Sequence, residues 1–158
     1  MAANIDTPPP KKTLTDIAKE MRDIDFTLMS TIAEDGSIAT RPMSNNRDVE
    51  FDGDSYFFTD EVTTAAKDLA RDPTVGLSLQ GKAGWLGKPP IFITIEGRAE
   101  LIRDRIQFRA HWHKGLELWW DGPDAPGIVL IKVHADRIHY WDGLDEGEVK
   151  APPGDEKG

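Results

Sequence analysis

The sequence predicts a mainly antiparallel β structure: a closed or split barrel of six or seven strands with Greek-key-like connections and two or three short helices. Short runs of β-branched and aromatic residues recur along the chain, separated by turn signals such as Glu34-Asp35-Gly36-Ser37. Nearly all connections between these runs are too short for the crossovers that parallel strands need. A barrel also protects strand edges better than an open sheet does.

The elements of the first half follow from local signals. Thr13 or Thr15 can cap a helix with an apolar face, and a turn at residues 34–37 joins two strands into a hairpin. A second hairpin is expected across residues 51–55. A helix from Thr63 ends before Asp72-Pro73, because a residue preceding proline disfavours the helical region. The expected helices are residues 13–21 and 63–71, and the expected strands are residues 26–32, 38–44 and 56–59.

The second half alternates strands with glycine-rich and proline-rich loops. Gly97 is a candidate β-bulge within a long strand, since glycine inside a strand often marks one. A helix is expected at residues 104–113. The other expected segments are strands at residues 75–80, 91–102, 128–133 and 137–141, and loops at residues 81–90 and 119–123.

Length and composition bound the possible functions. The 158 residues fit one domain, predicted to span residues 13–142 between a flexible leader (1–12) and a flexible acidic tail (143–158). No apolar run approaches the roughly 20 residues of a membrane helix, and no secretory signal is present. The net charge of −9 argues against a nucleic-acid surface. Cysteine is absent, which excludes disulfides and thiol chemistry and fits a cytoplasmic protein.

Basic and hydroxyl residues gather near a predicted helix start. Thr64 and Lys67 lie in its first turns, where free N–H groups and the helix dipole favour a phosphate, and Arg41 adds a guanidinium fork. Met43 and Phe58 can lie along an aromatic cofactor. In the structural alternative, Arg41 pairs with one of the 28 acidic residues, and Lys67 pairs with Asp68 or Asp72 on its own helix. No P-loop or dinucleotide fingerprint is present.

The histidines and tryptophans have simpler interpretations. His111 and His113 are two residues apart on a predicted helix, which places them on different faces, so no metal site is expected. The five tryptophans are expected mostly in packing roles, and Trp141 is the best candidate for cofactor contact. No nucleophile–base pair stands out, so the catalytic residues, if any, stay unassigned.

Several segments, in order, resemble the pyridoxamine 5′-phosphate oxidase-like family of FMN-binding split barrels, and within it the bacterial general stress proteins. The resemblance covers about residues 17–141. It rests on these segments: Thr40-Arg41-Pro42-Met43, Tyr56-Phe57-Phe58-Thr59 with Lys67 eight residues later, Asp72-Pro73, Ile95-Glu96-Gly97-Arg98-Ala99, Asp121-Gly122-Pro123-Asp124-Ala125-Pro126, Ile128-Val129-Leu130-Ile131-Lys132-Val133 and Tyr140-Trp141-Asp142.

The resemblance implies an FMN cofactor at the interface of a homodimer. It implies that Arg41 and Lys67 bind the phosphate, and that Trp141 lies near the flavin, from either subunit. It also implies a set of residues along the isoalloxazine ring and ribityl chain, namely Pro42, Met43, Phe58 and Thr59. One departure is Ala65, where family members commonly carry Ser or Thr; Thr64 can supply a hydroxyl one residue earlier.

The expected function is that of a flavin-binding general stress protein, an FMN-dependent oxidoreductase acting on a small molecule. Two alternatives stay open: a non-catalytic flavin-binding or flavin-sequestering protein, and a cofactor-free member that uses the barrel for protein contacts. FAD, a deazaflavin or haem are alternative cofactors. Pyridoxamine-phosphate oxidase activity itself is disfavoured, because the short acidic C-terminal segment offers no place for its substrate-phosphate residues.

Overall fold

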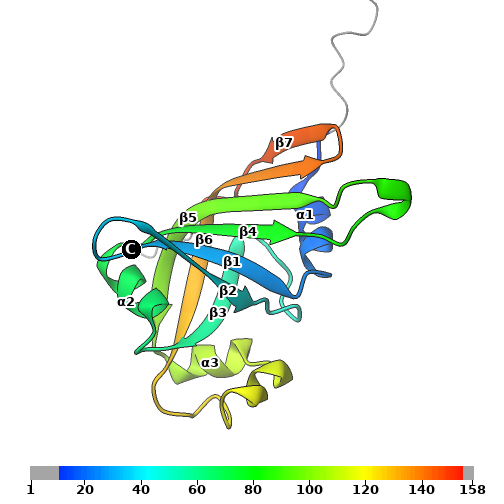
Figure 1. The fold of residues 1–158 in the computed structure, drawn as a ribbon. Helices are drawn as coiled ribbons and strands as arrows, with labels where there is room; N and C mark the ends of the chain where they lie inside the picture. Colours follow the sequence, from blue (N-terminus) through cyan, green and yellow to red (C-terminus); the bar gives the residue numbers. More distant parts are fainter. Residues whose placement is uncertain (1–10, 155–158) are drawn as a thin grey trace, which may run out of the picture.

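The computed structural model describes residues 11–154 (Figure 1). Within them, the chain forms seven strands, three α-helices and two short 3-10 helices. In chain order they are α1 Leu14–Met21, β1 Phe26–Ile32, β2 Ile38–Ser44, β3 Asp54–Asp60, α2 Thr64–Arg71, β4 Thr74–Gln80, η1 Trp85–Gly87, β5 Phe92–Ile102, α3 Arg105–His111, η2 Lys114–Leu118, β6 Ile128–Asp142 and β7 Asp145–Val149.

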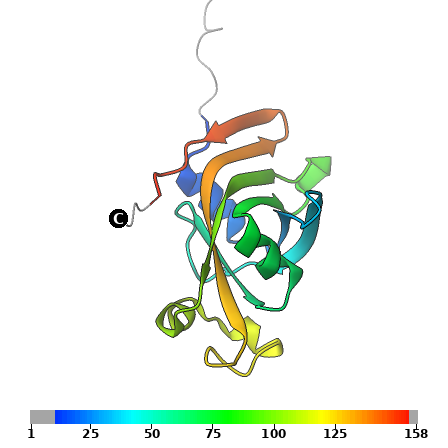
Figure 2. The same ribbon diagram turned by 90° about the vertical axis from the view of Figure 1, so that its left-hand side faces the viewer.

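The strands form one antiparallel sheet with the order β2-β1-β4-β5-β6-β3, and β7 pairs with β6. Strands β2 and β3 are consecutive in the chain but lie at opposite ends of this path. The sheet curves into a barrel that is split between these two edge strands (Figures 1 and 2). The predicted fold class, a split antiparallel barrel with short helices, is therefore confirmed.

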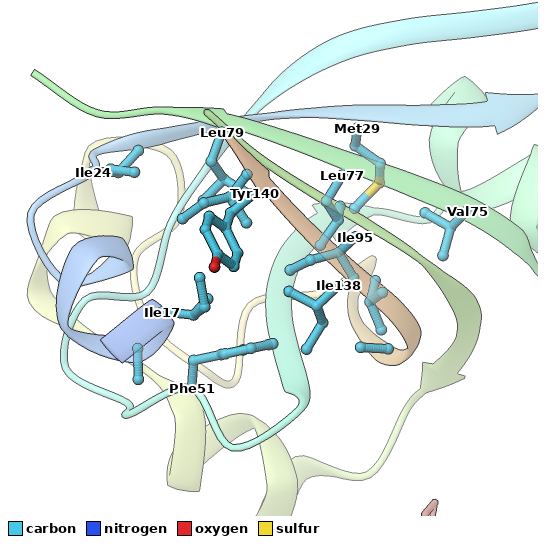
Figure 3. Packing of buried hydrophobic residues seen from close by; sticks show 14 of the residues in the cluster. Ile17, Ile24, Met29, Phe51, Val75, Leu77, Leu79, Ile95, Ile138 and Tyr140 are labelled. Carbon is cyan, nitrogen blue, oxygen red and sulfur yellow. The ribbon is translucent and has the colours of Figure 1, made fainter. Parts of the chain in front are cut away.

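Helix α1 covers one end of the barrel. Thr13 caps it in a capping box, accepting from the Asp16 N–H while the Asp16 carboxylate accepts from the Thr13 N–H at 2.8 Å. Its buried face presents Ile17 to the main core, where Figure 3 shows the Tyr140 ring directed toward this helix. Both side chains are fully buried.

The predicted bulge at Gly97 of β5 is a register shift whose extra residue, Asp136, lies on the facing strand β6. The pairing of β5 with β6 shifts register between Glu96 and Gly97. A Cβ atom at Gly97 would lie 2.1 Å from the His134 carbonyl oxygen, so only glycine fits this close approach.

A second, smaller cluster lies outside the main core. It joins Phe58 of β3 to Phe108 of α3 and Leu116 of η2. The ring centroids of Phe58 and Phe108 are 5.9 Å apart in an edge arrangement. This cluster holds the α3–η2 segment against the β3 end of the sheet, the lower part of Figure 1.

Two predicted pairings are wrong. No hairpin crosses residues 51–55, because β3 pairs with β6 from Asp54↔His134 to Asp60↔Ile128. The two strands predicted at residues 128–133 and 137–141 are one continuous strand, β6, since the ladder with β5 continues past the extra residue Asp136.

The predicted termini also need correction. Residues 145–149 are not a frayed tail but form β7, which folds back on β6 through Gly143 at φ 64°. Lys12, assigned to the leader, donates its N–H to the Tyr140 hydroxyl at 3.2 Å and pairs with Asp142 at 3.1 Å. Residues 1–10 and 155–158 of the predicted leader and tail lie outside the described residues. No helix within residues 11–154 is long and apolar enough to cross a membrane.

Candidate functional site

The split in the barrel holds a pocket of about 310 Å³, which we call the β2–β3 slot. One wall comes from β2 and the other from β3, with η2 and the loop after it closing the lower side. The slot is lined by Phe26, Pro42, Met43, Ser44, Phe58, Thr59, Leu116, Trp119 and Trp120. Four of the predicted cofactor residues, Pro42, Met43, Phe58 and Thr59, are thus brought together from two strands that do not pair with each other.

Strand β2 divides its motif between two faces. Arg41 and Met43 are partly buried, whereas Pro42 between them is exposed. Successive side chains of a strand point to opposite faces, so Arg41 and Met43 share the inward one. Pro42 pairs with Leu28 of β1, and its position on an edge strand is one that proline tolerates.

Arg41 is held by a buried carboxylate of α2. Its Nη1 donates to the Thr31 hydroxyl at 2.7 Å and to the Met29 carbonyl at 3.4 Å, and its Nη2 lies 3.5 Å from the carboxylate of Asp68. The structural alternative predicted for Arg41, pairing with an acid, is therefore present. A guanidinium has five N–H groups. These three contacts leave two N–H groups for another acceptor.

Asp68 collects three donors although it is only 6% exposed. Besides Arg41, it accepts from the Thr31 hydroxyl at 2.8 Å and from Arg71 at 2.9 Å. A buried carboxylate is tolerated when it is paired and hydrogen-bonded in this way. The cluster ties α2 to β1 and β2.

The start of α2 meets the rim of the slot. The Thr63 side chain caps the helix by accepting from the Ala66 N–H at 3.3 Å, and its hydroxyl lies 3.1 Å from that of the slot residue Thr59. Thr64 is exposed, whereas Ala65 is 3% exposed and faces the core. Thr64 is therefore the exposed hydroxyl of this first turn.

Lys67 is the free cation of this region. Its side chain is exposed, and within residues 11–154 its ammonium makes no hydrogen bond or ion pair. The alternative in which Lys67 pairs with Asp68 or Asp72 is wrong, because Asp68 takes Arg41, Arg71 and Thr31 instead. The carboxylate of Asp72 accepts from Thr74, which holds its pKa below the ordinary value.

The aromatic wall was not predicted. The ring centroids of Trp120 and Trp112 are 6.4 Å apart. The Trp112 ring packs edge-on against Phe58, with 5.3 Å between their centroids. Trp119, which also lines the slot, is 60% exposed. No local signal identifies this wall, because it forms only where the segment after α3 packs against Phe58 of β3.

The family of the chain can now be identified. The family model described as pyridoxamine 5'-phosphate oxidase like matches residues 12–151. The chain belongs to the pyridoxamine 5'-phosphate oxidase-like family.

Members of this family and structures of the same fold resemble the chain over most of its length. General stress protein 26 of Bacillus subtilis is 25% identical over 124 residues, covering 72% of this chain and 84% of that protein. The crystal structure of general stress protein 26 from Bacillus anthracis superposes with a TM-score of 0.69 at 24% identity, covering 85% and 95% of the two chains. A heme-binding protein from Mycobacterium smegmatis superposes with a TM-score of 0.72 at 12% identity, covering 92% and 64%.

In this member of the family, Trp141 lies away from the slot. It is near the end of β6, paired with Phe92 and Glu146, and its ring stacks on His139 at 4.5 Å. The slot adjoins the other end of β6, where Thr59 pairs with Val129. Along β6 the two positions are twelve residues apart, and Trp141 is not part of the slot lining. The structure therefore does not bring Trp141 to the slot of its own chain.

The histidines do not converge. His111 stacks on Tyr56 at 3.9 Å and bonds the Gln107 carbonyl, whereas His113 lines a different pocket. In the described part of the chain, no group of three or more potential ligands could hold a metal ion.

Proposed function

We propose that the chain binds FMN in the β2–β3 slot. The observation that carries this proposal is the convergence of Pro42, Met43, Phe58 and Thr59 on one largely apolar pocket. Its rim is a helix start with an unpaired exposed lysine. An apolar slot beside a cationic helix start matches a molecule with a flat ring system and a terminal phosphate.

Each residue then has a physical role toward FMN. Met43 and Phe58 pack against the ring, and the Thr59 hydroxyl offers a polar contact at the edge of the slot. Lys67 supplies the free charge for the phosphate, and Arg41 adds its two remaining N–H groups. Thr64 offers the hydroxyl that Ala65 cannot. Bound FMN would supply the electron chemistry, while the chain provides binding, orientation and exclusion of water.

FMN fits this slot better than haem does. Haem iron is held by His, Cys, Met or Tyr. No His or Tyr lines the slot, the chain has no Cys, and Met43 is the only slot residue of these types. The exposed Lys67 at the helix start matches a phosphate group.

A homodimer is part of the proposal, because the outer face of the sheet is apolar and exposed. Phe26, Leu28 and Ile38 on one side of this face are 62%, 49% and 73% exposed. Phe92 and Trp141 are exposed farther across it. Directly opposed residues lie on the same face of a sheet, and the pairs Leu28↔Ser78, Ser78↔Thr94 and Thr94↔His139 form one such row. The exposed apolar residues lie on this row or an even number of residues from it along a strand, so they share one face. Apolar patches of this extent mark interfaces.

A second copy on this face also accounts for Trp141. In a twofold dimer the same surface meets itself, so the far end of one sheet can lie over the near end of the other. Pro42 on β2 and Trp141 on β6 share the outer face, with β1, β4 and β5 between them. Trp141 of the partner subunit would then close the slot that Pro42 lines.

The test compares FMN with riboflavin, which lacks the phosphate. FMN should comigrate with the protein in gel filtration, with flavin absorbance retained. Lys67→Ala should weaken FMN about tenfold, roughly 1.4 kcal/mol, and leave riboflavin unchanged, because only the phosphate contact is lost. Lys19→Ala, an exposed lysine on α1, is the control and should change neither.

Two results would contradict the proposal: no flavin binding by the parent, or equal loss of FMN and riboflavin in Lys67→Ala. Turnover is tested separately. Reoxidation of NAD(P)H-reduced FMN by an added acceptor, faster with the protein than with free FMN, favours the oxidoreductase. Binding without acceleration favours the non-catalytic flavin-binding protein.

A further inference from the structure

A second and larger pocket adjoins the slot. It has a volume of about 640 Å³ and shares Phe26, Ser44 and Trp119 with the slot, so the two spaces have a common wall. We call it the charged pocket. It is lined by Arg22, Asp25, Phe26, Ser44, Asn45, Arg47, Asp48, His113, Lys114, Gly115, Leu118 and Trp119.

The loop after β2 fixes the shape of this pocket. The Asn45 side chain donates to the Ile24 carbonyl at 2.7 Å and accepts from the Thr27 hydroxyl. The next side chain, Asn46, donates to the His111 carbonyl at 2.9 Å. Successive residues thus tie the loop to the α1–β1 connection and to α3.

The charged side chains that line the pocket leave a net charge of one positive unit. Arg47 and Asp25 neutralise each other through a 2.6 Å ion pair. The side chains of Arg22 and Lys114 make no hydrogen bond or ion pair within the described residues, and Asp48 is the one remaining acid of the lining. A pocket lined by more cations than anions is unusual in a chain of net charge −9.

The other side of the pocket is apolar. Phe26, Leu118 and Trp119 expose 62%, 83% and 60% of their surface around it. Burial lowers the pKa of His113 although the Asp48 carboxylate opposes this, so the imidazole adds a neutral polar group. The pocket therefore combines a flat apolar wall, continuous with the slot, with two free cations.

We propose that the charged pocket binds a small organic anion with a flat apolar body, such as an aromatic carboxylate. The anionic group lies at Arg22 and Lys114, and the body lies along Trp119 toward the slot. That this ligand is the substrate of the slot rests on the proposed FMN function. The binding itself does not.

The probe is a matched pair of ligands, 4-fluorobenzoate and 4-fluorobenzamide, which differ in charge at nearly constant shape. Their ¹⁹F line widths report binding to the whole protein. The parent should bind the carboxylate about tenfold more tightly than the amide. Lys114→Gln should reduce this preference about fivefold, and Arg22→Gln/Lys114→Gln should remove it, because the cations are lost while the apolar wall stays. Lys19→Gln is the control with unchanged preference.

The outcomes separate this proposal from the flavin proposal. Equal binding of the two ligands by the parent, or a preference that survives in a folded double variant, overturns the charged pocket; the single Lys114→Gln variant decides if the double variant fails to fold. The same variants should keep the FMN affinity of the parent. If FMN does not bind but the carboxylate preference depends on Lys114, the flavin proposal fails and the charged pocket stands.

Discussion

The end of the barrel that α1 covers, which we call the sealed end, differs from the split between β2 and β3 in how far its aromatic side chains are exposed. At the sealed end, Tyr140 is fully buried beneath α1 and packs among aliphatic side chains (Figure 3). At the split side, Trp119 is mostly exposed and lines two pockets. Burial is what stabilises a fold, and exposed aromatic surface is what a ligand or partner can cover. We therefore expect Tyr140 at the sealed end to contribute to stability and Trp119 at the split to contribute to binding.

The largest effect should come from the sealed end. Tyr140→Ala should lower the free energy of unfolding by about 3–5 kcal/mol, because it empties a large, fully buried site. Urea denaturation followed by circular dichroism measures this loss.

Two variants test that contrast. Tyr140→Phe keeps the ring and loses only the hydroxyl that accepts from the Lys12 N–H, so it should cost about 1 kcal/mol. Trp119→Ala should cost no more than about 0.5 kcal/mol, as for an exposed position. A Trp119→Ala variant as unstable as Tyr140→Ala would break the comparison.

The carboxylate that bridges the split should have an intermediate effect. Asp68→Asn removes the charge that Arg41 and Arg71 share and should cost roughly 1–3 kcal/mol in the same denaturation experiment. Asp124→Asn is the matched control at the exposed pairs with Arg105 and Arg109, where solvent screens the interaction, and its loss should be clearly smaller. Equal losses would mean that Asp68 does not brace the split.

Mixing two variants that each bind FMN weakly tests whether Trp141 completes the slot of the partner subunit. Lys67→Ala and Trp141→Ala should each weaken FMN binding, by about tenfold for Lys67→Ala. If each slot uses Lys67 of one subunit and Trp141 of the partner subunit, mixed dimers regain one intact site in two. FMN titration after refolding the two variants together should therefore show a tight fraction that neither variant has alone. No tight fraction in confirmed mixed dimers would exclude a shared site.

The smallest effect concerns pH at the charged pocket. Burial holds the pKa of His113 below its ordinary value of 6.5, so the unfolded state binds the proton more readily. The associated stability is present above pH 6.5 and is lost as the pH falls through that value toward the lower pKa of the folded state. His113→Asn should flatten this part of the stability–pH curve in thermal unfolding. An unchanged curve would mean that the imidazole is as well solvated as in the unfolded chain.

The sequence predicted those parts of the site that local signals specify. The helix start at Thr63 and the strand irregularity at Gly97 follow from residue types. Family resemblance placed Pro42 and Phe58 together, and the structure agrees. Periodicity alone could not predict that these residues lie close together. Strands β2 and β3 do not pair, and they come near each other only because they are the two edges of a curved sheet.

The missed features all depend on contacts between distant segments. Nothing near β3 indicates that it pairs with β6, and the acidic composition of β7 hides a strand that forms only because the Tyr140 end of β6 offers a free edge. Trp119 could not be placed, since its position depends on where α3 packs against Phe58. Asp68, the partner of Arg41, could not be singled out among the 28 acidic residues of the sequence.

Pro42 does more than line the slot. Strand β2 is an outer edge of the sheet, and an edge strand with a full row of N–H and C=O groups recruits strands of other molecules. Pro42 removes one donor from this row and so interrupts any such ladder in its middle. A residue that lines the slot therefore also protects the protein against edge-to-edge aggregation during folding at high concentration.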